Sequence, residues 1–323
     1  MQKNSAGPLH IIFSNLAFTG ITARNFLFIL LYVPFLIGAF HAGRFFLLLI
    51  FKDRGKSKFF DTLHPSLFRN RFLQSFKNFL FLGVPAIAAL YLLGFALGAL
   101  SEVRAFSLTD EFLMQADRLL TGSYPFIALG NIAHPAWFVA LVSVFYLCLG
   151  ILLLVFAVHL FIEKQGLFRE CAGAFFLGMM MMFALWWVFP ALTPRQRFLD
   201  NVFRLPVPSQ VQQALSLYRP QKEIVSFFDT LRQEEKNISV FVVSNMPSAH
   251  IAWAVLLVYY AYRAFPLLLI AIIPFAVLSS YGTLLFAQHY FIDIPAGLLV
   301  GIVSILIAHF MARISADEKE KKL

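Results

Sequence analysis

The sequence predicts an all-α protein built as a polytopic bundle of transmembrane helices, and three observations support this prediction. Apolar residues make up 60% of the 323 residues, and charged residues make up only 13%. Soluble domains contain about 45–50% apolar and about 25% charged residues. The apolar residues also gather in long runs, and most runs reach the roughly 20 residues that a helix needs to cross a bilayer. Composition therefore excludes an ordinary soluble domain and a disordered chain.

Seven apolar runs are expected to form membrane helices. They cover residues 26–43 (continuing to 51), 79–100, 136–162, 171–190, 246–262, 267–287 and 292–312. The fifth run is short and contains His250. Arg263 and Pro266 predict a tight break between the fifth and sixth helices, because proline does not continue a helix.

The distribution of Lys and Arg predicts how the helices are oriented. Residues 52–77 contain seven Lys or Arg and two Asp, which indicates a cytoplasmic loop. Alternation then places 101–135 and 191–248 outside, and 163–170 inside. We expect an N-terminal segment (1–77) with one membrane helix, a core (78–313) and a charged cytoplasmic tail (314–323). Basic cytoplasmic loops account for the net charge of +9, so no nucleic-acid partner is expected.

The outer segment 191–248 is unusually long for a connection between helices. Residues 206–236 predict a short amphipathic helix and a charged stretch, which fit either a substrate lid or a plain solvated loop. The two cysteines, Cys148 and Cys171, have no metal-ligand spacing and form no disulfide framework. No metal and no cofactor are expected, because Arg195, Ser248 and helix N-termini would stabilise the charge of a phosphate.

Four ionisable residues lie at the ends of the predicted helices: Arg195, His250, His289 and Asp293. Ionisable groups at such positions are costly and usually functional. Arg195 follows the fourth helix, His250 opens the fifth, and His289 and Asp293 open the seventh. The predicted topology therefore places all four at the same depth on the outer face.

These residue types suit phosphoryl transfer. His289 and Asp293 are spaced i, i+4, so on a helix the carboxylate would orient the imidazole as a nucleophile. Ser248 and His250 open another helix, whose N-terminus binds anions. Arg195 supplies a forked donor for phosphate oxygens. Two alternatives stay open for His289 and Asp293: a satisfied buried pair, or half of a metal site.

At these residues the chain resembles the type 2 phosphatidic acid phosphatase superfamily. Pro247-Ser248-Ala249-His250 matches the second family motif, P-S-x-H, and His289 to Asp293 matches the H-x3-D end of the third. The resemblance covers residues 79–312, which correspond to the six-helix family core; the first helix would be an addition. It implies that His289 forms a phosphohistidine, Asp293 orients it, His250 protonates the leaving oxygen, and Ser248 holds a phosphate oxygen.

Two positions depart from the family pattern. Thr283 stands where the third motif usually has Arg, and Val188 stands where the first motif usually has Lys. The motif cations are therefore incomplete, and Arg197, Lys222 and Gln288 are the candidates to take their place.

The departures resemble one branch, which includes fungal inositol phosphorylceramide synthase and its bacterial relatives. Residues 117–125 resemble the D-x-x-L-x-G-x-x-P element of that branch. Residues 189–195 resemble its proline-rich first motif, with Thr193 in place of a second proline. Residues 246–254 and 288–290 resemble its later motifs. This branch implies that Asp117 helps to shape the site.

We therefore expect an integral-membrane enzyme that acts on a lipid phosphate or phosphodiester at the extracytoplasmic face. Water as acceptor would make it a phosphatase, and an alcohol would make it a headgroup transferase. The site would face outward from a bacterial plasma membrane, or into the lumen in a eukaryote. Two alternatives remain: a transporter with a His/Asp proton relay, and an inactive homologue, suggested by Thr283 and Val188.

Overall fold

The computed structural model describes residues 109–238 and 245–320, and these residues form helices without a strand among them. This confirms the all-α prediction. The predicted helices at 26–43 and 79–100 and the basic loop 52–77 lie outside the described residues. The helices are α4 (Asp110–Thr121), α5 (Pro125–Gly130), α6 (Ala136–Glu163), α7 (Gln165–Val188), η3 (Arg195–Leu199), α8 (Ser209–Ser216), α9 (Lys222–Ile238), α10 (Ala249–Ala264), η4 (Pro266–Leu268), α11 (Leu269–Leu285) and α12 (Asp293–Glu320).

Four of these helical segments are long and apolar enough to cross a membrane: Ala136–Phe161, Gln165–Val188, Pro266–Leu285 and Asp293–Ile314. Large apolar side chains are exposed along one face of α6, at Val144, Leu147, Ile151 and Leu154. In water such a stripe would normally be buried or replaced by polar residues. Contact with lipid chains explains it, and the prediction of a membrane bundle is confirmed.

The short helix α10 lies at the centre of the bundle, where it packs against α6, α7, α11 and α12. Its 16 residues span about 24 Å, which is less than the ~30 Å hydrocarbon core of a bilayer. Leu257, Tyr260 and Ala261 have no exposed surface, so the surrounding helices enclose α10. The expected break after α10 is confirmed, since a 3-10 turn begins at Pro266.

Two helices extend beyond the apolar runs that predicted them. α7 begins at Gln165, so Lys164 alone separates it from α6, and the predicted loop 163–170 is largely helical. α12 continues to Glu320, so most of the predicted tail 314–323 is helical as well. Both extensions have the same cause. An apolar run ends where polar residues begin, but Gln, Arg, Glu and Lys are good helix formers outside the lipid.

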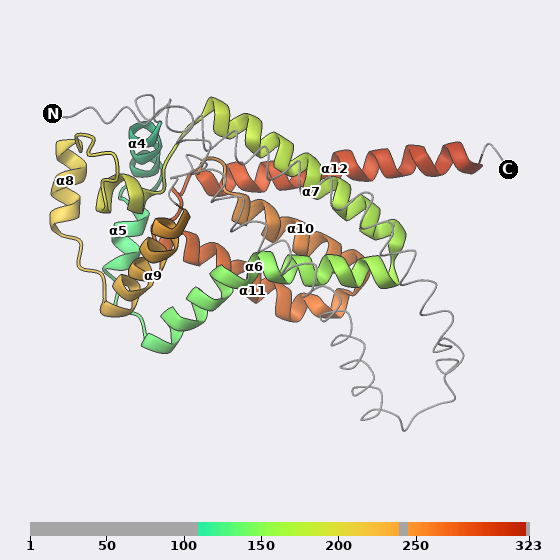
Figure 1. Ribbon diagram of the computed structural model, residues 1–323, viewed down its shortest axis with the longest axis horizontal. Helices are drawn as coiled ribbons and strands as arrows, with labels where there is room; N and C mark the ends of the chain where they lie inside the picture. Colours follow the sequence, from blue (N-terminus) through green and yellow to red (C-terminus); the bar gives the residue numbers. More distant parts are fainter. Residues whose placement is uncertain (1–108, 239–244, 321–323) are drawn as a thin grey trace, which may run out of the picture. The chain divides into compact units, whose positions relative to one another are not determined.

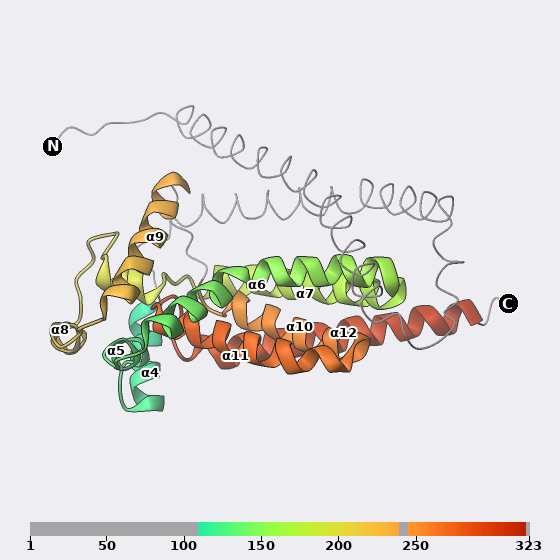
Figure 2. The same cartoon turned by 90° about the horizontal axis from the view of Figure 1, so that it is seen from below.

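The remaining helices gather at one end of the bundle, where α6 and α12 begin and α7 and α11 end (Figure 1, Figure 2). We call α4, α5, η3, α8 and α9 the helical cap. The short amphipathic helix expected within 206–236 is confirmed as α8, whereas the expected charged stretch forms part of a second helix, α9, that was not predicted. Their apolar faces join a buried cluster with the ends of α6 and α11, which includes Leu113, Met114, Val142, Tyr146, Ile224, Phe227, Phe228 and Phe286.

Polar contacts join three helices at the opposite end of the bundle. Glu170 of α7 is buried, and its Oε1 lies 3.1 Å from both Arg263 Nη1 and His309 Nδ1. Arg263 belongs to α10 and His309 to α12. Both ends of the bundle are thus fixed by contacts between side chains from different helices.

Candidate active site

The loop between α11 and α12 carries His289. Ala287 has a φ of 51°, in the left-handed region that residues other than glycine rarely adopt. The main-chain N–H groups of Gln288 and His289 both donate to the Thr283 carbonyl, at 2.8 and 3.0 Å. The loop is therefore closed on the end of α11, and His289 is buried in it.

His289 and Asp293 are in contact, with 3.2 Å between His289 Nδ1 and Asp293 Oδ2. The same carboxylate oxygen accepts the main-chain N–H of Tyr290 at 2.9 Å. The sequence predicted that i, i+4 spacing on one helix would bring these two side chains together, and this explanation is wrong. α12 begins at Asp293, so His289 precedes the helix, and the loop rather than helical spacing brings the two side chains together.

The environment of His289 favours a neutral imidazole. Burial lowers the pKa of His289 to about 3, and a hydrogen bond to the backbone of Asn245 opposes this effect. A neutral ring keeps the lone pair that nucleophilic attack requires. His289 is therefore in the protonation state that a nucleophile needs near neutral pH.

Asp117 of α4 holds the end of the same loop. Its Oδ2 accepts the N–H of Phe291 at 2.8 Å, and its Oδ1 accepts the N–H of Ile292 at 2.9 Å. Burial raises the pKa of Asp117 to about 6, against the effect of these two hydrogen bonds and with a contribution from the Asp293 charge. Asp117 thus satisfies the N–H groups of the two loop residues that directly precede α12.

The starts of α10 and α12 lie side by side. Ser248 is the N-cap of α10, and its Oγ accepts the N–H of Ile251 at 3.4 Å. The main-chain N–H of Ser248 donates to the Asp293 carbonyl at 3.3 Å. Gly297 permits this approach, because a Cβ there would lie 2.5 Å from the Ser248 carbonyl oxygen.

His250 is fixed in the first turn of α10 by an aromatic stack. Its ring lies parallel to Tyr146 of α6, with 4.4 Å between ring centroids and 3° between planes. The centroid of the His289 ring lies 6.2 Å from that of His250. Trp186 of α7 supports the same helix start, because its Nε1–H donates to the Pro247 carbonyl at 3.0 Å. The two histidines are therefore neighbours on separate, anchored segments.

Arg195 lies in the short π-helical turn η3, and its side chain is fully buried. Its main-chain N–H donates to the Ala287 carbonyl at 2.9 Å, which docks η3 on the His289 loop. Its guanidinium forms an ion pair with Asp200. Asp200 Oδ1 also accepts from Arg232 Nε of α9, at 3.0 Å. Asp200 therefore joins two arginines beside the loop.

Asp110, the first residue of α4, anchors the residue that follows His289. Its Oδ1 accepts the Tyr290 hydroxyl at 2.8 Å and the N–H of Leu192 at 2.9 Å. Burial raises the pKa of Asp110 to about 7, although these hydrogen bonds and the Arg197 charge oppose the shift. Asp110 thus connects the His289 loop to the segment before Arg195.

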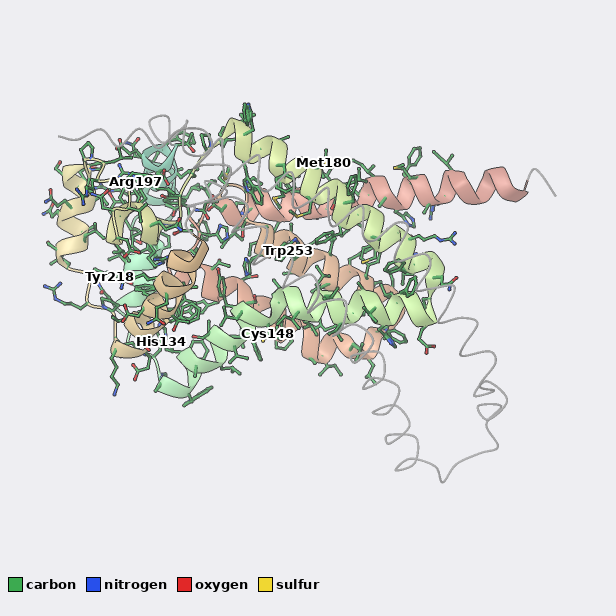
Figure 3. All side chains as sticks on the ribbon, in the orientation of Figure 1. His134, Cys148, Met180, Arg197, Tyr218 and Trp253 are labelled. Carbon is green, nitrogen blue, oxygen red and sulfur yellow. The ribbon has the colours of Figure 1, made fainter. Side chains whose placement is uncertain are left out.

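Arg197 and Gln288 are held by neighbouring protein groups. Arg197 Nη2 lies 3.2 Å from Glu111 Oε1 and 2.9 Å from the Pro206 carbonyl. Figure 3 places Arg197 in the helical cap. Gln288 Nε2 donates to the Phe286 carbonyl at 2.9 Å. Both side chains therefore lie in the segments around His289.

The two positions without the family cations have different surroundings. Thr283 is buried, and its hydroxyl donates to the Ser280 carbonyl at 2.7 Å. Val188 is the last residue of α7 and is 59% exposed. Lys222, a candidate substitute, begins α9 with its side chain 92% exposed. Lys222 therefore extends away from the buried groups around His289.

Sequence reasoning missed four residues of this arrangement: Asp110, Asp200, Arg232 and Asn245. Asn245 is 3% exposed, and its amide nitrogen and oxygen have no hydrogen-bond partner in the part of the chain that the structure describes. Because Asn245 stands two residues before the motif that begins at Pro247, its place in the sequence could have indicated a site residue. Asp110 offered none, because its partner Tyr290 lies 180 residues further along the chain.

Comparison with known proteins gives one match. The model of a protein family described as the PAP2 superfamily matches residues 111–307, which is more than half of the chain and runs from the first turn of α4 into α12. The searches of curated proteins and of solved structures returned no match. The matched segment contains Arg195, Ser248, His250, His289 and Asp293.

Proposed function

The chain belongs to the PAP2 superfamily, and on that premise we propose that it transfers the phosphoryl group of a lipid phosphate or phosphodiester through a phosphohistidine at His289. Membership supports a membrane enzyme of the phosphatase or phosphotransferase type. The observation that carries the finer proposal is the buried contact between His289 and Asp293, with His250 as a neighbour on another helix.

The proposed reaction has two half-reactions. In the first, His289 Nε2 attacks phosphorus, an N–P bond forms, and the bond from phosphorus to the leaving alcohol breaks. Asp293 holds the Nδ1–H, and protonated His250 gives its proton to the leaving oxygen. In the second, water or an alcohol gives its proton to His250 and attacks phosphorus. The N–P bond then breaks and neutral His289 returns.

Ser248, Arg195 and the N-terminus of α10 are the proposed ligands of the phosphoryl oxygens. A helix N-terminus and a forked guanidinium both favour an anion. The buried amide of Asn245, which adjoins this helix start, is a further donor. Because protein groups neutralise the phosphoryl charge, the proposed reaction uses no metal and no cofactor.

The resemblance to the inositol phosphorylceramide synthase branch supports an alcohol as the acceptor. The segment that carries Asp117 is part of that resemblance, and Asp117 contacts the His289 loop. We therefore propose headgroup transfer between lipids as the main reaction, with hydrolysis as the reaction that the same intermediate gives with water.

Trapping the covalent intermediate tests this proposal. The full-length protein in lipid nanodiscs is incubated with radiolabelled phosphatidic acid or phosphatidylinositol, then quenched and assayed for acid-sensitive label on the protein. We expect label on the wild type and none on His289→Gln. His250→Gln should slow labelling about 100-fold or more.

His309→Gln is the matched control, because His309 lies at the opposite end of the bundle. It should label like the wild type. A folded wild type that takes up no label from either donor would overturn the proposal and favour a transporter or an inactive homologue. When the label is taken up, its release as phosphate or on a lipid alcohol separates hydrolysis from transfer.

We propose that the site faces the extracytoplasmic side, as the excess of Lys and Arg in residues 52–77 suggests. Single cysteines at Gln212, in the helical cap, and at Gly166, at the other end of the bundle, test this in a background without Cys148 and Cys171. A membrane-impermeant maleimide should label the first in intact cells and the second only after lysis. The reverse pattern would contradict the proposed side.

A further inference from the structure

One face of the 12-residue helix α4 is buried against the candidate active site. Asp117 on this face accepts two main-chain N–H groups of the His289 loop, from Phe291 and Ile292. The buried residues are spaced so that they share one side of the helix: Asp110, Leu113, Met114 and Asp117. Whatever positions α4 therefore also positions the loop that carries His289.

A second face of α4 is polar and contacts other parts of the helical cap. Glu111 pairs with Arg197 of η3, with 3.2 Å between Oε1 and Nη2. Arg118 donates a hydrogen bond to Gln210 of α8. Because these residues lie on a different side of the helix from Asp117, the two sets of contacts together fix the rotation of α4 about its own axis.

The third face of α4 is apolar and exposed. Phe112, Leu119 and Leu120 are 64%, 86% and 61% exposed. Ala116, Leu119 and Leu120 follow Phe112 at i+4, i+7 and i+8, which places the four residues on one side of the helix. We call these four residues the apolar face of α4. An exposed apolar stripe on a helix that is fixed through its other faces marks a contact surface.

The start of α4 adjoins the end of the membrane helix α7. The N–H and the hydroxyl of Thr109, the N-cap of α4, both donate to the Pro190 carbonyl, at 2.9 and 3.1 Å. Pro190 follows directly after Trp187, Val188 and Phe189, which are exposed large apolar residues at the end of α7. Tryptophan at the end of a membrane helix is typical of the membrane–water interface. α4 therefore begins at the level where α7 leaves the lipid.

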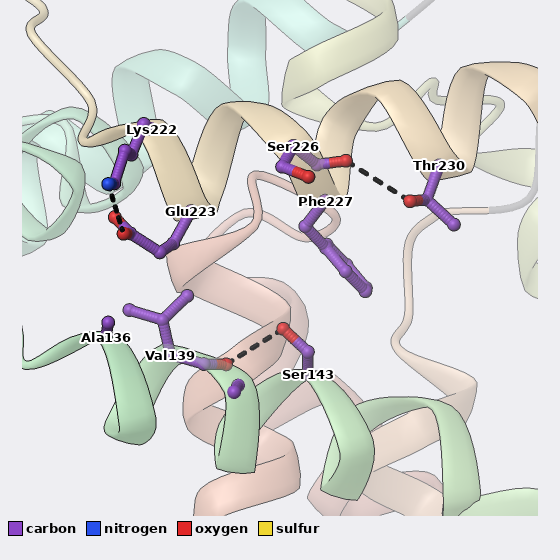
Figure 4. Close-up of a pocket in the computed structure, with 9 residues that line it drawn as sticks. Ala136, Val139, Ser143, Lys222, Glu223, Ser226, Phe227 and Thr230 are labelled. Carbon is purple, nitrogen blue, oxygen red and sulfur yellow. Dashed lines mark hydrogen bonds and ion pairs between the residues drawn. The ribbon is translucent and has the colours of Figure 1, made fainter.

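The direction of α4 suits this level. Figure 2 shows that α4 runs across the long axis of the bundle, so it lies in the plane of the membrane surface. The first turn of α6 has the same interfacial character, because Trp137 is 68% exposed there. Lys222 and Glu223 of α9 lie beside Ala136 in that turn, lining one groove with it (Figure 4). An amphipathic helix in this plane buries its apolar side at the boundary between headgroups and acyl chains.

We propose that α4 is an interfacial helix and that its apolar face contacts the lipid of the leaflet at the cap end of the bundle. The partner of this face is the membrane itself, and the contact does not depend on the proposed reaction. A helix is about 10–12 Å across, so the contact places the His289 loop within about one helix diameter of membrane lipid. That proximity suits a lipid substrate, a consequence that rests on the proposed function.

Spin labelling of the full-length protein in nanodiscs tests the contact. Phe112→Cys and Leu120→Cys each carry a nitroxide, in a background without Cys148 and Cys171. Collisions of the nitroxide with oxygen, which concentrates in hydrocarbon, are compared with collisions with a water-soluble nickel chelate. We expect oxygen to dominate at both positions and both labels to lie about 5–10 Å below the lipid phosphates.

Two further labels calibrate this measurement. Val144→Cys reports lipid, because Val144 is 53% exposed on a membrane helix. Gln212→Cys reports water, because Gln212 is an exposed polar residue of α8 in the same helical cap. The labels on α4 should resemble the first and differ from the second.

A second measurement uses the wild-type protein and so needs no substitution that folds. Nanodiscs contain phosphatidylcholine with a photoreactive diazirine in one acyl chain, close to the glycerol. After activation, the labelled peptides are identified by mass spectrometry. We expect photolabel on residues 110–121 and none on residues 209–216 of α8.

The outcomes separate this proposal from the proposed function. Chelate access at Phe112 and Leu120 equal to that at Gln212 would place α4 in water and overturn the interfacial assignment. Immobile nitroxides that neither reagent reaches, without photolabel on α4, would show that protein covers this face and would overturn it as well. Neither measurement depends on turnover, so an inactive protein with lipid contact at α4 would contradict the proposed function alone.

Discussion

The main-chain N–H of Ser248 donates to the main-chain carbonyl of Asp293, at 3.3 Å. This hydrogen bond joins the segment that carries His250 to the segment that carries His289. The two segments are far apart in the sequence, and neither side chain takes part in the bond. The spacing of the two histidines therefore depends on how closely the starts of α10 and α12 approach each other.

Gly297→Ala should disrupt this approach. The added Cβ would lie 2.5 Å from the Ser248 carbonyl oxygen and 3.0 Å from Ile251 Cβ, so α10 and α12 must move apart. Overpacking of this kind costs about 1–3 kcal/mol of stability. We expect a lower Tm and phosphohistidine labelling slowed about tenfold or more. In the control Gly173→Ala, the new Cβ meets Ala308 Cβ at 3.9 Å, so both measurements should stay at wild-type values. Wild-type labelling by Gly297→Ala would show that this contact does not set the geometry.

Asp117→Asn should loosen the His289 loop. Asp117 accepts two main-chain N–H groups, one on each oxygen, and an asparagine keeps only one of these acceptors. An unsatisfied buried donor costs about 1–3 kcal/mol, so the Tm of thermal unfolding and the rate of phosphohistidine labelling should both decrease. Gln115 is exposed on the same helix, and Gln115→Ala should change stability by less than about 0.5 kcal/mol. Equal stability of the two variants would contradict the proposed role of Asp117.

Asp110→Asn should flatten the pH dependence of stability. The pKa of Asp110 is raised from 3.8 to about 7, so its stabilising contribution is full below pH 3.8 and is lost as the pH rises through 7. Asparagine keeps an oxygen acceptor for Tyr290 and Leu192 but does not ionise. We expect the Tm of the wild type to fall more than that of the variant between pH 5 and pH 8, as measured by thermal unfolding.

Other titratable groups, among them Asp117 and His289, also affect the wild-type curve but cancel in this comparison. The contribution of Asp117, whose pKa is raised to about 6, is also lost as the pH rises. His289 has a lowered pKa, so its contribution is lost as the pH falls below 6.5. Both are present in the wild type and in Asp110→Asn. Parallel curves for the two proteins would argue against ionisation of Asp110 in this range.

Arg232→Gln should act on substrate binding through Arg195. Arg232 and Arg195 share Asp200, so loss of one partner leaves the carboxylate and the Arg195 side chain less well positioned. We expect KM for a lipid phosphate to rise about tenfold, as for loss of a charged hydrogen bond, with a smaller change in kcat. Arg219→Gln, an exposed cation before α9, is the control and should change neither constant. A fall in Tm without the KM effect would indicate a purely structural role for Arg232.

The sequence by itself determined the class of protein and the residues of greatest interest. Long apolar runs indicate membrane helices because a bilayer imposes a length and a composition on any segment that crosses it. Pro247 to His250 and His289 to Asp293 are short, local patterns, and both lie within residues 111–307, which the family model matches. The ends of the helices were harder to predict from the sequence, since polar helix formers extend α7 and α12 beyond their apolar runs.

Only the tertiary structure decided how the site is held together. His289 lies in a loop rather than on the helix of Asp293, and the loop is fixed by Thr283, Asp117 and, through Tyr290, by Asp110. The stack of Tyr146 on His250 and the pairing of Arg232 with Asp200 likewise join distant segments. These contacts leave no periodic pattern in the sequence, because each depends on where several helices pack and not on the residues beside it in the chain.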